Sequence, residues 1–117
     1  MLAEAAKLVA DLENRTKNRR PVDNSEALLR SVIAEHQNGE VDYDRMVPAL
    51  ADAGREQMPM IRADLERAGA LRSISFRGVS SDGWDVYDVA FENAAMEWRF
   101  ALAADGRFSG LFFRRLP

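Results

Sequence analysis

The apolar positions of this chain change their spacing once, near residue 70. Before this point they recur every three or four residues, which is typical of amphipathic helices. A first helix is predicted from the stripe Leu2, Ala5, Val9 and Leu12, and Pro21 favours a linker after it. A second helix is predicted to begin at a cap on Asn24 or Ser25 and to end at Asn38-Gly39. Its apolar side comprises Leu28, Leu29, Val32, Ile33 and His36.

Two further helices are predicted before the pattern changes. The third begins near Tyr43 or Asp44, and its apolar residues are Met46, Val47 and Leu50. The fourth carries Ile61, Leu65 and Ala68. Pro59 lies in this periodic stretch, and because proline removes a helical hydrogen bond, it predicts either a helix start or a kink.

From Leu71 onward the spacing becomes two, which is typical of half-buried strands. Four strands are predicted, over residues 71–79, 84–92, 95–103 and 107–115. Their connections are short, so neighbouring strands should form antiparallel hairpins. The expected fold is therefore α+β, with N-terminal helices packed on a four-stranded antiparallel meander.

Turns centred on Ser81-Asp82, Asn93-Ala94 and Asp105-Gly106 predict one consistent register. It pairs Phe76 with Tyr87, Tyr87 with Phe100, Val89 with Trp98, and Trp98 with Phe113. A slip of one residue would scatter these side chains over both faces, so the agreement supports the register. The inner face is expected to form the core and to line any ligand pocket. The predicted pocket residues are Tyr43, Met46, Phe76, Tyr87, Phe91, Trp98 and Phe100.

The outer face of the predicted sheet is mixed. Asp88 is expected opposite Arg99, and Glu97 opposite Arg114, as two cross-strand ion pairs. Val86, Phe108 and Phe112 also point outward in this register. Such apolar groups either mark an interface with another protein or are covered by the N-terminal helix or the last residues, and the sequence leaves both open.

Composition restricts the classes of protein to consider. The chain has 117 residues, which suits a single domain divided into an N-terminal helix and linker (1–20), a helical layer (21–70) and a sheet (71–117). Its net charge of −3 makes nucleic acid an unexpected partner. Charged residues interrupt its N-terminal apolar stretch and no run could span a bilayer, so a cytoplasmic protein without membrane partners is expected. The absence of cysteine excludes disulfides and thiolate metal sites.

Reactive chemistry is sparse. The single histidine, His36, is interpreted as structural, with a protonated ring near a helix C-terminus. Asp42, Tyr43 and Asp44 fit a helix cap and a packed ring better than an acid–base site. Asp82, Asp85 and Asp88 resemble a metal cluster by count, but Asp82 and Asp85 are expected around a turn, and neither a metal nor another cofactor is predicted.

The stretches "DYDRMVPALADAGREQMPMIRADLERAGAL", "GALRSISFRGV" and "GWDVYDVAFENAAMEWRFALAADGRFSGLFFR" resemble a tail domain of bacterial serine hydrolases of the β-lactamase and penicillin-binding type. They also resemble free-standing proteins of the nuclear transport factor 2-like (NTF2-like, cystatin-like) class. The resemblance covers roughly residues 42–115 and implies a cone of bent antiparallel sheet closed by helices, often around an apolar cavity. The chain departs from this pattern at Ala94, where the family favours glycine.

Two functions follow as hypotheses. No serine precedes a lysine by three residues and no G-x-S-x-G motif occurs, so the hydrolase machinery is missing. The first hypothesis is a non-catalytic accessory or interaction domain that self-associates as a homodimer, or docks on another protein domain, through its outer sheet face. The alternative is a pocket for a small apolar ligand, with isomerase- or lyase-type acid–base chemistry from a carboxylate such as Asp44.

Overall fold

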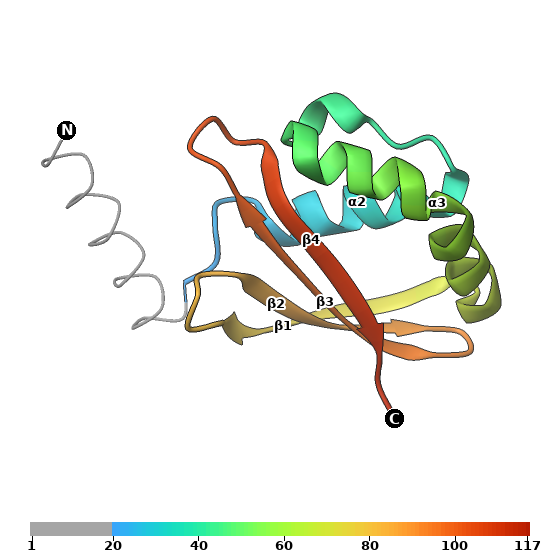
Figure 1. Ribbon diagram of the computed structural model, residues 1–117. Helices are drawn as coiled ribbons and strands as arrows, with labels where there is room; N and C mark the ends of the chain where they lie inside the picture. The colour runs from blue at the N-terminus through green and yellow to red at the C-terminus, as the bar shows by residue number, and fades with distance from the viewer. Residues whose placement is uncertain (1–19) are drawn as a thin grey trace, which may run out of the picture.

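The structure, a computed structural model, describes residues 20–117, so the predicted N-terminal helix lies outside the described residues. Helices α2 (Ser25–Asn38) and α3 (Pro48–Ala68) precede four strands, β1 (Leu71–Val79), β2 (Asp85–Phe91), β3 (Ala95–Leu102) and β4 (Phe108–Arg115). The strands form one antiparallel sheet in the order β1-β2-β3-β4. Both helices pack on the same face of this sheet (Figure 1). The predicted α+β class and meander are confirmed.

Helix α2 has the predicted bounds, but no side chain of its own caps its first turn. Asn24 occupies the predicted cap position with φ 59°, but its side chain makes no cap hydrogen bond. At the other end Gly39 takes φ 73°, and its N–H donates to the carbonyl of His36 at 3.3 Å. A left-handed glycine after the last helical turn is a common helix stop.

The predicted third and fourth helices are one helix, α3, which begins only at Pro48. Tyr43–Arg45 instead forms a separate 3-10 turn, η1, and the Asp42 side chain accepts from the Asp44 N–H at 3.1 Å. Met46 and Val47 follow as extended chain against β4, where the Val47 N–H donates to the Phe108 carbonyl at 2.9 Å. Pro59 lies within α3, and the helix axis turns about midway along its length (Figure 1).

The strand register is as predicted between β1 and β2 and between β3 and β4, and it is displaced between β2 and β3. Phe76 pairs with Tyr87, and Trp98 with Phe113, as expected. Between β2 and β3, however, Tyr87 pairs with Trp98 instead of Phe100, a displacement of two residues. The turn is centred one residue earlier, on Glu92-Asn93, because the N–H groups of these residues donate to the carbonyls of Ala70 and Ala68 at 2.8 Å each. An even displacement keeps every side chain on its predicted face.

A bulge in β4 corrects the predicted position of Phe108. Gly110 pairs with Ala101, but Phe108 pairs with the next residue, Leu102, so Ser109 is left unpaired. An extra residue in one strand reverses the faces beyond it. Phe108 therefore points inward and is 2% exposed, and it is not an outer-face interface residue as the sequence suggested.

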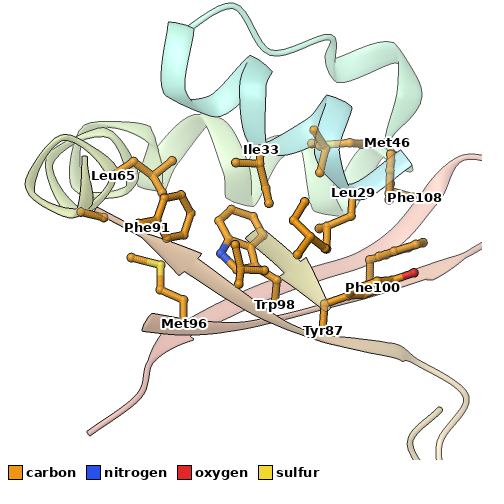
Figure 2. Close-up of a cluster of buried hydrophobic side chains, with 14 of the residues drawn as sticks. Leu29, Ile33, Met46, Leu65, Tyr87, Phe91, Met96, Trp98, Phe100 and Phe108 are labelled. Carbon is orange, nitrogen blue, oxygen red and sulfur yellow. The ribbon is translucent and has the colours of Figure 1, made fainter. Parts of the chain in front are cut away.

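The core lies between the helices and the inner face of the sheet. Leu29 and Ile33 of α2 pack above Trp98 and Tyr87, and Leu65 of α3 lies near Phe91 (Figure 2). Burying each such side chain contributes about 1.5–3 kcal/mol. The largest fully buried apolar side chains are Trp98, Tyr87, Phe100, Phe108, Leu29, Ile33 and Met96.

Candidate functional site

A pocket of about 390 Å³ opens between α3 and the part of the sheet formed by β3 and β4. Its wall is mostly apolar, and three polar side chains, His36, Gln57 and Asp64, reach it. Pockets that hold small organic ligands have this size and this combination of apolar wall and few polar groups. The apolar wall includes Met46, Leu50, Met60, Ile61, Leu111 and Phe113.

One face of α3 forms the helical wall of the pocket. Leu50, Gly54, Gln57, Ile61 and Asp64 recur every three or four residues and line it together. Such spacing places side chains on one face of a helix. Gly54 contributes no side chain, and a Cβ atom there would lie 3.3 Å from Cε1 of Tyr43. Glycine at this position therefore lets the Tyr43 ring lie close against α3.

Only two of the predicted pocket residues line this pocket, Met46 and Trp98. Tyr43 lies beside Gly54 on the outside, where the guanidinium of Arg55 stands 4.5 Å from the centroid of its ring. The other four predicted residues, on strands β1, β2 and β3, do not line the pocket. Of the four predicted residues concerned, Tyr87, Phe91 and Phe100 are buried core, and Phe76 is 37% exposed on strand β1.

His36 reaches the pocket from α2, where sequence reasoning assigned it only a structural role. The residue is 4% exposed, and its ring Nδ1 lies 2.7 Å from the carbonyl oxygen of Val32, one turn earlier. Burial lowers the pKa of His36, although the Val32 carbonyl and the Glu35 carboxylate act in the opposite direction. The ring is therefore neutral at pH 7, and the predicted protonated imidazole is wrong. The feature of the sequence that could have indicated this position at the pocket is that His36 ends the apolar side of α2.

A second group of buried polar side chains connects α2 to β2. Asp85 is 1% exposed, and its Oδ2 accepts from the Val22 N–H at 2.9 Å and from the Ser25 hydroxyl at 2.7 Å. The Tyr87 hydroxyl donates to Ser25 Oγ, also at 2.7 Å, and burial raises its pKa, so it stays protonated. The Asp85 carboxylate thus ties the residues at the start of α2 to β2, and we assign the group a structural role.

The aspartates that resembled a metal cluster are separated by this arrangement. Asp85 is buried on the inner face, whereas Asp82 accepts from Ser80 in the preceding loop, and Asp88 forms an ion pair with Arg77. Within residues 20–117, no three histidine, aspartate or glutamate side chains are grouped so that they could hold a metal ion.

The outer face of the sheet has one buried carboxylate beneath three arginines. Glu97 is 1% exposed, and its oxygens lie 2.5 Å from Arg77 Nη1, 2.9 Å from Arg99 Nη2 and 3.1 Å from Arg114 Nε. The predicted Glu97–Arg114 pair is confirmed. The predicted Asp88–Arg99 pair is wrong, because the shifted register places Asp88 opposite Glu97 and leaves Arg77 as its partner.

The three residues predicted to form an interface have different fates. Phe112 is on the outer face of the edge strand β4 and 50% exposed, and it is also among the residues that line the pocket. Val86 is on the same face but only 6% exposed, in a shallow groove that it lines with Arg77 and Arg99, so it offers little surface to a partner. Phe108, as described above, belongs to the core.

Comparisons with known proteins do not assign the chain to a family. No family model matches the sequence, and neither a curated protein nor a solved structure shows a significant match to it. In the part of the chain that the structure describes, no helix combines the length and apolar character that crossing a membrane requires.

Proposed function

We propose that this protein is a small-ligand-binding domain of the NTF2-like type and that its ligand is a small, mostly apolar molecule held between α3 and strands β3 and β4. The single observation that carries this proposal is the pocket of about 390 Å³ with its apolar wall. The packing of both helices on one face of a four-stranded antiparallel sheet supports the NTF2-like part of it.

The proposed activity is binding, and we assign no acid–base role to Asp42 or Asp44, the carboxylates considered from the sequence. Asp42 is engaged as the cap of η1, and neither Asp42 nor Asp44 is among the residues that line the pocket. A general acid or base must reach the reacting proton within hydrogen-bond distance. Neither carboxylate is placed to do so for a molecule in this pocket.

The experiment is an NMR titration of the 15N-labelled protein with 4-propylanisole, an apolar probe that fits the pocket volume. Small ligands of this size bind with dissociation constants of about 0.1–1 mM. We expect saturable shifts of the backbone amides of Gly54, Ile61 and Leu111. The Ala53→Leu variant, which extends a side chain from the pocket wall, should abolish them. Ala63→Leu is the matched control, because Ala63 is exposed on the same helix. No saturable shift in the wild type, or an equal effect of both variants, would contradict the proposal.

A second candidate function is self-association through the outer face of the sheet. The observation that favours it is Phe112, a large aromatic residue half exposed on a sheet face that no helix within residues 20–117 covers (Figure 1). Sedimentation equilibrium of the wild type and of Phe112→Asp tests it. A wild-type dimer that Phe112→Asp dissociates and Met60→Asp does not would support self-association, since Met60 is similarly exposed on α3. A monomeric wild type excludes it.

A further inference from the structure

The polar side chain most firmly positioned at the pocket is His36. It is more than nine-tenths buried, and the 2.7 Å contact from Nδ1 to the Val32 carbonyl fixes the orientation of its ring. A carbonyl oxygen only accepts hydrogen bonds, so Nδ1 carries a proton in this contact. In the neutral ring, Nε2 is then the nitrogen with a free lone pair.

Among the described residues, no hydrogen bond uses this second nitrogen. Within residues 20–117, the fully buried side-chain nitrogens and oxygens that lack a hydrogen-bond partner are Asp85 Oδ1, Trp98 Nε1 and Arg99 Nε. His36 Nε2 is not among them, and the hydrogen bond described for this ring uses Nδ1. Nε2 is therefore the nitrogen of His36 left for a ligand, and His36 is among the residues that line the pocket.

We propose that His36 Nε2 is the hydrogen-bond acceptor that selects the ligand, and that the ligand is an apolar molecule bearing one hydroxyl or N–H donor. This inference rests on the proposed function, because it specifies the chemistry recognised by the same pocket. Trp98, whose ring centroid lies 6.5 Å from that of His36 in an edge-on arrangement, is also among the residues at this end of the pocket.

The charges at the pocket favour the same class of ligand. Its described lining contains the carboxylate of Asp64 and no lysine or arginine. An anionic ligand would therefore lose its hydration without gaining a cationic partner, which is costly in an apolar site. A neutral molecule with a donor group can satisfy Nε2 and leave its apolar part against the methionine, leucine and phenylalanine side chains.

The test compares 4-propylphenol with its methyl ether, 4-propylanisole, which lacks the donor. The dissociation constants of both compounds are measured by NMR titration for the wild type and for His36→Leu. One neutral hydrogen bond changes affinity by about fivefold. We expect the wild type to favour the phenol over the ether by about fivefold more than His36→Leu does, and the affinity for the ether to change little.

A second measurement needs no variant. His36 is the only histidine in the chain, so the 15N resonance of its unprotonated Nε2 is unambiguous. It should move toward the position of a protonated nitrogen on addition of 4-propylphenol and stay unchanged with 4-propylanisole.

The outcomes separate the two proposals. If both compounds bind in the pocket, Nε2 does not move and the preference is the same with and without His36, the role of His36 is overturned and the binding function stands. If neither compound shifts the pocket residues, both proposals fall.

Discussion

Replacing Glu97 by glutamine should destabilise the sheet far more than an ordinary surface substitution. Glutamine preserves the shape of the side chain but removes the charge that Arg77, Arg99 and Arg114 contact from three sides. These contacts lower the pKa of Glu97 from 4.5 to about 2, mainly through the hydrogen bond from Arg114 and then that from Arg99, against the opposing effect of burial. This lowering corresponds to about 3 kcal/mol in favour of the charged carboxylate in the folded state.

The sign of the pH dependence follows from the same values. Because the pKa is lower in the folded than in the unfolded state, the stabilisation is complete above about pH 4.5 and is lost as the pH falls toward 2. Urea unfolding followed by circular dichroism should therefore show Glu97→Gln less stable than the wild type by about 3 kcal/mol at pH 7. The difference should shrink to less than about 1 kcal/mol at pH 2.5.

The matched control is Asp52→Asn. Asp52 forms an ion pair with Arg55 at 3.3 Å, but its side chain is 80% exposed, and exposed pairs of this kind contribute about 0.5 kcal/mol. If Glu97→Gln changes stability no more than Asp52→Asn at pH 7, or if its effect does not depend on pH, the reasoning about the buried carboxylate is refuted.

Three further predictions test other parts of the structure by the free energy of unfolding. Gly110→Ala should lower the stability by about 1–3 kcal/mol, because the alanine Cβ would lie 2.4 Å from Cη2 of Trp84. In a Trp84→Ala background this clash is removed, and the same substitution should be stabilising because glycine weakens a strand. Asp85→Asn should cost about 1 kcal/mol, since the amide oxygen can still accept from Ser25, whereas Asp85→Ala should cost about 3 kcal/mol by leaving buried donors unpaired. The wild type should lose stability as the pH falls below 6.5, by up to about 1.4 kcal/mol per pH unit. The reason is that the lowered pKa of His36 in the folded state makes the unfolded chain the better proton acceptor. The His36→Leu variant should not show this pH dependence.

Each of these expectations has a contrary result. An equal cost of Gly110→Ala in both backgrounds would mean that Trp84 does not lie over this glycine. Equal effects of asparagine and alanine at position 85 would show that the Asp85 oxygen does not hold α2. A pH profile unaltered by His36→Leu would mean that the ring is not buried in its neutral form.

The sequence was sufficient for the fold class and for the face of most strand residues, because alternation is preserved by any even change of register. The β2–β3 register shows this, since the shift of two residues left Tyr87 and Trp98 on the inner face. The shift itself depends on hydrogen bonds from the turn to Ala68 and Ala70, a tertiary contact that no local turn preference contains. The inward position of Phe108 likewise depends on a bulge at Ser109, which the alternation cannot reveal.

The site was less predictable than the fold. The inner-face aromatic residues were the obvious candidates for a pocket, but Tyr87, Phe91 and Phe100 fill the core completely. The space instead follows α3, along the helical face that carries Leu50, Gln57 and Ile61. The space left in the core depends on the distance between α3 and the sheet. The periodicity of the sequence does not specify this distance.

We propose that a small apolar molecule binds between α3 and the β3–β4 part of the sheet. The most direct measurement is intermolecular NOEs between 4-propylphenol and the 13C-labelled methionine methyl groups. We expect NOEs to Met46 and Met60, which line the pocket, and none to Met96, which is fully buried in the core. Contacts absent from both lining methionines at ligand saturation would contradict it.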